Sequence, residues 1–395
     1  MEQVRNRLIF VTSAVALVVL CASAASAQSR APAPNVRSTV QPSITAAVVY
    51  DDNVFGNGSN TPDSVLRVTP GISLIRVRPR AVLTAVYFLD AERYQRYSEL
   101  TTPQARQTGT FTAFFSPTPR RAWEVGVGYF STTNPTELNT LTSINVGRQR
   151  ADRWSTSGMF RQQLGRQTTF EVNYLAMRDQ YRTGATFENG WEARLGHRPT
   201  ARTEFFIREN TRFIDFGSTG NFTRNMVSAG YGWRDRDLHW TAEGGGATTS
   251  GEPMWTAMGT LGREFGFNDI TGSYGRSTTT AIGIPTPIVV DYMDVAFTRT
   301  PRVRVPSAEQ PGRQPRGFRF AFRVGMSRNT LPVGEARAYR LWIEVAKPLS
   351  STLLLVAIVD GTKQDTVGTT VFGLGGDILR NRVSLSLQFS PWSPR

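Results

Sequence analysis

The fold is decided by the stretch Phe318-Arg319-Phe320-Ala321-Phe322-Arg323-Val324-Gly325-Met326-Ser327. In an extended strand, successive side chains point to opposite sides, so the three phenylalanines, Val324 and Met326 share one face. The arginines and the small residues share the other. A strand with one apolar face and one charged or small face separates hydrocarbon from a polar phase. Because this pattern recurs almost to the C-terminus, the sequence predicts an all-β chain that forms a single antiparallel transmembrane β-barrel.

The connections between the predicted strands also have a rhythm. Short turns, such as residues 78–80 and 235–237, alternate with longer polar links, such as residues 53–63 and 280–286. Short turns at one end and longer loops at the other are typical of outer-membrane barrels. The count comes to about 18 strands, and barrels of that size can enclose an aqueous channel.

Two segments leave the strand count open by one. Residues 145–163 can be read as one long strand or as two. Residues 301–316 are a long segment rich in proline and arginine where the rhythm predicts a short turn. We settle on about 18 because single-chain bacterial barrels have an even number of strands.

The N-terminus has the pattern of a secretory signal peptide. Arg5 and Arg7 precede an apolar run at residues 8–20, and an Ala-x-Ala site follows at residues 25–27. Cleavage there would remove Cys21, the only cysteine, so disulfides and cysteine-bound metals are excluded from the mature chain. The sequence therefore predicts export to the bacterial outer membrane. The expected parts of the chain are a signal peptide at 1–27, a disordered periplasmic lead-in at 28–39, the barrel at 40–390 and a C-terminal tail at 391–395.

The net charge is strongly positive. Lysine and arginine number 45 against 31 acidic residues, which gives +14, and Lys347 and Lys363 are the only lysines. Arginine binds carboxylate and phosphate through two parallel hydrogen bonds and stays charged in partly dry places. In an exported chain we therefore expect contact with outer-membrane lipid, with lipopolysaccharide phosphates or with anionic polysaccharide, and not with nucleic acid.

Several arginines are expected on the lumenal face by the same alternation. Two interpretations stay open: these side chains pair with acids such as Glu204 and Glu344 and brace the wall, or their excess charge favours the passage of anions. The residues concerned are Arg67, Arg202, Arg208, Arg212, Arg319, Arg323 and Arg340.

Catalytic groupings are missing from the sequence. The two histidines, His197 and His239, lie outside any acyl-transfer motif such as Gly-x-Ser-x-Gly. Residues 51–53 carry oxygen ligands but lack the spaced series of a calcium-binding loop. We therefore expect no enzyme activity, no metal and no cofactor.

The first predicted hairpin resembles a known family. Its motif is Tyr50-Asp51-Asp52-Asn53-Val54-Phe55, followed by a second strand containing residues 68–72, Val-Thr-Pro-Gly-Ile. This resembles the outer-membrane β-barrel porin family of Gram-negative bacteria, and the motif residues carried over are Tyr50, Asp51, Asp52, Asn53 and Phe55. Members often accompany exopolysaccharide genes, so the resemblance implies a channel with a role in glycan export or surface assembly. The chain departs from the usual barrel C-terminus, because Phe389 is followed by six further residues.

These observations together predict an outer-membrane channel. Its expected task is the export of anionic polysaccharide or the passage of anionic solutes. The alternative is a barrel that transports nothing and serves as a structural or adhesive surface protein.

Overall fold

A computed structural model describes residues 37–182, 184–300, 317–332, 334–350, 352–367 and 377–390. The expected signal peptide, most of the lead-in, the segment 301–316 and the C-terminal tail lie outside the described residues. No helix among the described residues is long and apolar enough to cross a bilayer.

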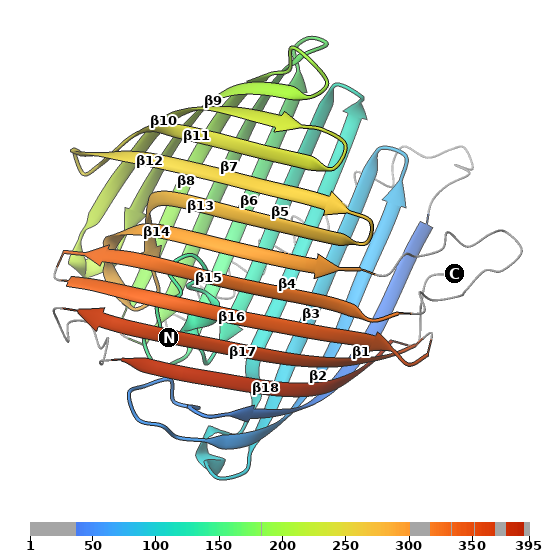
Figure 1. Ribbon diagram of the computed structural model, residues 1–395, viewed down its shortest axis with the longest axis vertical. Coiled ribbons are helices and arrows are strands. Elements are labelled where there is room, and N and C mark those ends of the chain that lie inside the picture. Colours follow the sequence, from blue (N-terminus) through green and yellow to red (C-terminus); the bar gives the residue numbers. More distant parts are fainter. Residues whose placement is uncertain are drawn as a thin grey trace, which may run out of the picture.

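The chain forms one closed antiparallel sheet of 18 strands, which confirms the predicted fold class (Figure 1). Each strand pairs with its neighbours in sequence, and β1 closes the ring by pairing with both β2 and β18. The strands are β1 Arg37–Asp51, β2 Asp63–Arg78, β3 Ala81–Tyr94, β4 Thr102–Thr118, β5 Arg121–Thr132, β6 Ala151–Gln163, β7 Thr168–Tyr181, β8 Gly184–His197, β9 Thr203–Asp215, β10 Asn221–Arg234, β11 Leu238–Thr249, β12 Glu252–Phe265, β13 Asn268–Ala281, β14 Ile284–Arg299, β15 Arg319–Leu331, β16 Gly334–Pro348, β17 Leu353–Val367 and β18 Ile378–Phe389. Three short 3-10 turns lie between strands, at η1 Ser98–Leu100, η2 Pro135–Glu137 and η3 Gly217–Thr219.

Three boundaries differ from the expectation. Strand β1 begins at Arg37, inside the segment expected as lead-in, because residues 37–43 pair with β2. The segment 145–163 contains one strand, β6, preceded by a loop. The expected long link at 280–286 is wrong: only Ile282 and Gly283 separate β13 from β14, and Gly283 takes the positive φ of +85° that a tight turn needs.

The outer and inner faces alternate as expected. On β15, Val324 and Met326 are exposed outside, whereas Ala321 and Ser327 are buried on the lumenal side. The pairings carry this assignment round the ring, because residues directly opposite each other on neighbouring strands share a face. The outer face is an apolar belt of large exposed side chains, which suits the hydrocarbon core of a bilayer.

We expect the two faces of β18 to differ sharply in their tolerance of charge. Leu385 is 56% exposed on the belt, whereas its neighbour Ser384 lines a cavity in the lumen. Leu385→Arg should lower the free energy of unfolding in a lipid refolding assay by roughly 2–4 kcal/mol, the cost of an arginine near the middle of the lipid face. Ser384→Arg is the matched control and should cost much less. Equal costs would contradict the assignment of inside and outside.

Candidate functional site in the barrel lumen

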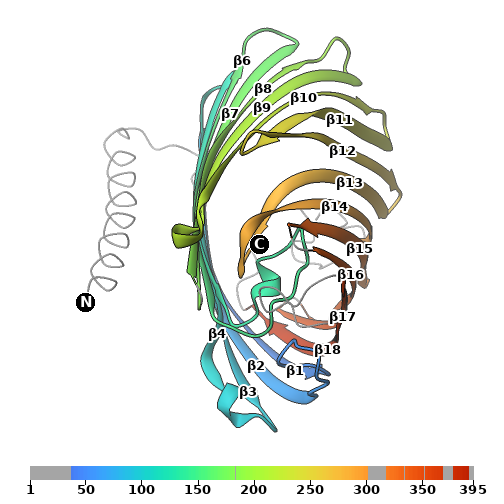
Figure 2. The same cartoon turned by 90° about the vertical axis from the view of Figure 1, so that its left-hand side faces the viewer.

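The loop between β5 and β6, residues 133–150, enters the lumen instead of lying on the rim. Figure 2 shows this green segment inside the ring of strands. Its far part reaches the opposite wall, where the Thr142 carbonyl accepts hydrogen bonds from Ser327 Oγ at 2.6 Å and Asn329 Nδ2 at 2.9 Å. The Asn145 N–H donates to Gln364 Oε1 at 2.7 Å, and Gln364 Nε2 donates to the Asn145 carbonyl at 3.3 Å. The loop therefore crosses the lumen from β5 and β6 to β15 and β17.

An apolar contact holds the crossing in place. Ile144 is fully buried against Ile284, Ile288, Leu331 and Ala336 of the far wall. Water is excluded from this contact, so it gives the loop a fixed position that hydrogen bonds alone in a wet lumen would not provide.

The loop is also tied to the tip of the β13–β14 hairpin. Ile282 donates its N–H to Asn139 Oδ1 at 2.7 Å, and Asn139 Nδ2 donates to the Ile144 carbonyl at 3.0 Å. Asn139 thus satisfies backbone groups of both segments at once.

Beside the loop, the lumen contains a cavity that we call the eyelet. It has a cavity volume of about 390 Å³ and is bounded by the loop and by strands from both ends of the chain. Its lining residues are Val49, Arg67, Arg106, Phe130, Glu137, Thr140, Arg340, Trp342, Ile358, Asp360, Arg382 and Ser384.

Arginines on β2 and β4 cover acids in the wall of the eyelet. Arg67 is 2.6 Å from Glu92, and Arg106 is 2.8 Å from Asp90. The Arg106 side chain is 39% exposed, whereas that of Asp90 is 2% exposed. The guanidinium therefore faces the passage, and the carboxylate lies behind it.

Another side of the eyelet also pairs exposed arginine with a less exposed acid, but there the acid, Asp360, itself lines the cavity. Asp360 on β17 binds Arg382 and lies 3.8 Å from Arg340. Arg340 is 41% exposed and Asp360 is 10% exposed. A solute in the passage would therefore meet arginine on both of these sides.

The loop adds one acid between these arginines. Glu137 Oε2 lies 3.9 Å from Arg106 and its Oε1 lies 3.9 Å from Arg382. A charge-assisted hydrogen bond between nitrogen and oxygen is about 2.7–2.9 Å long. At 3.9 Å the carboxylate therefore attracts both guanidiniums but forms a direct hydrogen bond with neither.

Arg208, Arg212, Arg319 and Arg323 also project into the lumen, away from the eyelet. Each has acidic neighbours: Arg208 lies 3.5 Å from Glu243, Arg212 2.5 Å from Glu188, and Arg323 2.7 Å from Asp294, while Arg319 bonds Glu344. Neutralising pairs of this kind correspond to the bracing interpretation. In such a pair the arginine side chain can still be the more exposed partner, 57% for Arg323 against 21% for Asp294, which corresponds to the interpretation that the arginines favour the passage of anions.

Arg202 stands at the short-turn end of the barrel, one residue before β9 begins at Thr203. Its carbonyl accepts a hydrogen bond from Arg234 N–H at 2.7 Å, and its exposed side chain lies 3.4 Å from Asp235 in the turn after β10. It lines a cavity with Glu204 and His239 at that end and lies away from the eyelet.

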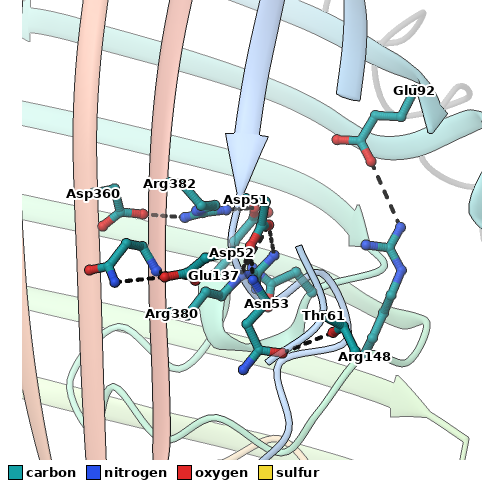
Figure 3. A network of polar contacts seen from close by, with 12 residues as sticks. Asp51, Asp52, Asn53, Thr61, Glu92, Glu137, Arg148, Asp360, Arg380 and Arg382 are labelled. Atoms are coloured by element: carbon teal, nitrogen blue, oxygen red, sulfur yellow. Dashed lines mark hydrogen bonds and ion pairs between the residues drawn. The ribbon is translucent and has the colours of Figure 1, made fainter. Parts of the chain in front are cut away.

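The first-hairpin motif lies at the seam between β1 and β18, at the loop end of the barrel. Arg380 donates two hydrogen bonds to Asp51 Oδ2, at 2.5 and 3.1 Å, and both side chains are less than a tenth exposed. Asp52 accepts bonds from the backbone and the side chain of Asn381, both at 2.7 Å. Figure 3 shows Arg380 and Arg382 of β18 reaching towards this end of β1.

The remaining motif residues complete the junction. Asn53 is buried and donates to the Leu379 carbonyl at 3.1 Å, Phe55 packs edge-on against Tyr97 at 5.1 Å, and Tyr50 points outward. The motif thus fastens the first loop to the last strand and does not line the eyelet.

Sequence reasoning missed Arg106, Glu137, Arg380 and Arg382. For Arg380 and Arg382 a signal existed, since extending the alternation of residues 383–389 backwards places both on the inner face. Nothing in the sequence of residues 133–150 marks them as a lumenal loop.

The two histidines occupy separate places. His239 faces the lumen on β11, and His197 at the end of β8 lies 3.1 Å from the Thr168 hydroxyl. In the described part of the chain neither histidine bonds a serine, and no group of acids and histidines is placed to hold a metal ion.

The chain is similar in overall path to several solved structures. These include Pseudomonas aeruginosa OpdQ, with a TM-score of 0.46, 10% identity, and coverage of 90% of this chain and 98% of that chain. For P. aeruginosa OccK2 (OpdF) the TM-score is 0.48 at 9% identity, with coverage of 90% of this chain and 98% of that chain. For Acinetobacter baumannii OccAB3 the TM-score is 0.44 at 9% identity, with coverage of 89% of this chain and 99% of that chain. Neither a family model nor a curated protein sequence matches the chain. The barrel itself is established by the strand pairings, and no residue role is carried over at these identities.

Proposed function

We propose that this chain is an outer-membrane channel that passes small anionic solutes through the eyelet. The supporting observation is the placing of charge there: exposed guanidiniums of Arg106 and Arg340 stand in front of nearly buried carboxylates. Because the Coulomb interaction falls with distance and is screened by water, a solute in the passage interacts more strongly with the nearer positive groups. The eyelet therefore attracts anions although the local charges nearly balance.

The decisive measurement is the reversal potential in a planar bilayer under a potassium chloride gradient. The wild type should prefer chloride. Arg106→Gln combined with Arg340→Gln should shift the reversal potential towards cations, because Asp90, Asp360 and Glu137 then dominate the passage. The shift should shrink at high salt, where the screening length is about 3 Å at 1 M.

Two comparisons make this test specific. Arg337→Gln removes an arginine from the outer face, where it pairs with Glu335 at 2.6 Å, and should leave selectivity unchanged. Arg319→Glu combined with Arg323→Glu removes positive charge from the wider lumen. It should shift the reversal potential towards cations by less than Arg106→Gln combined with Arg340→Gln does. If the reversal potential did not change when Arg106 and Arg340 are both replaced by glutamine, the proposal would be rejected. Absence of any current would favour the structural or adhesive barrel.

Export of anionic polysaccharide is the second candidate. The motif's resemblance to a family that accompanies exopolysaccharide genes favours it, and exposed arginines would suit an acidic polymer. The loop across the lumen favours small solutes, because a polymer would have to pass beside it. Adding acidic oligosaccharides of increasing length distinguishes the two: transient current blocks that lengthen with chain length indicate threading, whereas an upper size limit for any block indicates a small-solute channel.

A further inference from the structure

The excess positive charge of the chain does not lie in the lumen. In the half of each described strand nearest the short turns, the Asp and Glu residues are on the inner face by the pairing register, as Glu124 and Glu344 illustrate; the exception is Glu209, which faces outward at the midpoint of β9. The outer face of the same halves carries cations instead. We call this set the basic collar, and its members are Arg76, Arg121, Arg263, Arg299 and Lys347.

Contacts along the outer surface confirm where two collar side chains lie. The Arg299 guanidinium is 5.6 Å from the ring centroid of Phe318, an exposed residue at the edge of the apolar belt. Arg121 Nε donates to Gln162 Oε1 at 2.7 Å, and both residues are outward in the register of β5 and β6. These side chains therefore stand at the border of the belt and do not turn into the lumen.

The loop end of the barrel is different. There three outward cations have acids beside them: Arg276 is 2.9 Å from Asp291, Arg328 is 2.6 Å from Glu335, and Lys363 is 3.0 Å from Asp365. These three are thus neutralised within the chain, whereas Arg93 and Arg178, which also face outward at that end, have no ion pair among the described residues. The collar has no comparable acid on its own face among the described residues.

One collar residue also leaves a hydrogen-bond donor unused. Arg76 Nε is buried and has no partner among the described residues. Because this nitrogen has no accessible surface, an external acceptor would bind the terminal nitrogens of the Arg76 guanidinium instead.

We infer that the basic collar binds the phosphate groups of anionic phospholipids in the leaflet at the short-turn end. Guanidinium matches phosphate through paired hydrogen bonds, and long basic side chains at a belt border can reach the headgroups while their stems stay in the apolar region. The turns at this end add further exposed arginines, at Arg80, Arg120 and Arg166. The inference requires the barrel to lie in a bilayer, but it does not depend on which solute passes through the eyelet.

The test is the composition of the lipid retained by the protein. The barrel is refolded into vesicles of equal phosphatidylglycerol and phosphatidylcholine and extracted with mild detergent, and the co-purifying lipid is quantified by mass spectrometry. The wild type should retain phosphatidylglycerol severalfold over its share in the vesicle. Arg76→Gln/Arg263→Gln/Arg299→Gln should lower the retained ratio well below that of the wild type, towards that of the vesicle.

A matched control removes the same charge from the loop end. Arg328→Gln/Arg337→Gln/Lys363→Gln should keep the enrichment, since those cations already pair with acids. Added inorganic phosphate should not displace the lipid, because the acyl chains hold the headgroup beside the collar. Conductance like that of the wild type shows that the variants are folded, and the single change Arg263→Gln, which should reduce enrichment in part, serves if the triple variant does not fold. A wild-type ratio equal to the vesicle's, or an equal loss in both triple variants, would overturn the inference.

Discussion

Removal of the lumenal loop should raise the single-channel conductance severalfold. Replacing residues 136–147 by a short glycine-serine link would join β5 to β6 without crossing the lumen. Because the eyelet is the gap left between the loop and the wall, its loss should leave a passage as wide as an 18-stranded barrel allows. The measurement is conductance in planar bilayers at fixed salt.

Point substitutions can test the same loop without shortening it. Ile144→Asp places a charge in the fully buried contact that holds the loop against Ile284 and Ile288, and should release it. We expect higher and noisier currents. Leu141→Asp is the control on the same loop, because Leu141 is 44% exposed and should accept a charge. Unchanged conductance in both the deletion and Ile144→Asp would mean that ions take a path that the loop does not restrict.

Loss of the Asp51 carboxylate should destabilise the barrel more than any other single change considered above. Asp51→Ala would leave Arg380 buried at the β1–β18 seam with its main partner gone. Removing one member of a buried ion pair typically costs about 3–5 kcal/mol, because the remaining charge has no compensation. The free energy of unfolding, measured by urea titration in lipid, checks this value.

Neighbouring changes separate the buried pair from the motif in general. Asp52→Ala should cost far less, since Asp52 lies at the partly exposed edge and binds the neutral Asn381. Asp51→Leu combined with Arg380→Met should recover much of the stability, because no buried charge then remains. If Asp51→Ala and Asp52→Ala cost the same, Asp51 has no special role at the seam.

The architecture could be predicted because it depends on local alternation. Phe320 and Phe322 face the belt, and Arg319 and Arg323 face the lumen, for reasons contained in a few consecutive residues. Even the strand count followed from this period and from the turn signals. Register within a hairpin is set by its own turn, so each β-hairpin carries its own information.

The eyelet could not be predicted in the same way. Its loop is fixed by Asn139 with Ile282, by Thr142 with Asn329 and by Asn145 with Gln364. These partners are more than a hundred residues apart, and no repeating pattern marks them. The pairing of each lumenal arginine is equally hidden, since it depends on which inward residues two neighbouring strands bring side by side.

The net charge could not decide between the two interpretations of the lumenal arginines, for a related reason. Composition reports a sum of +14 but not where it lies. Inside the lumen the arginines meet acids, whereas at the belt border Arg76, Arg263 and Arg299 do not. An anion preference in the conductance would therefore come from the greater exposure of arginines than of acids in the eyelet, and not from the total charge of the chain.

The bond between Asp51 and Arg380 also bears on how the barrel completes its assembly. Alternation rejects a slip of one residue between the first and last strands, because it would turn every side chain to the wrong face. A slip of two residues leaves every side chain on its correct face, so the alternation does not disfavour it. In such a misaligned barrel the side chains at the seam would be displaced by about 6.8 Å, twice the rise per residue. Asp51, which lies directly opposite Arg382 in the native register, would then have to exchange its bond with Arg380 for a different arginine contact, and Asp52 would lose its bonds to Asn381. The native alignment is therefore favoured by a specific set of seam contacts that a two-residue slip does not reproduce.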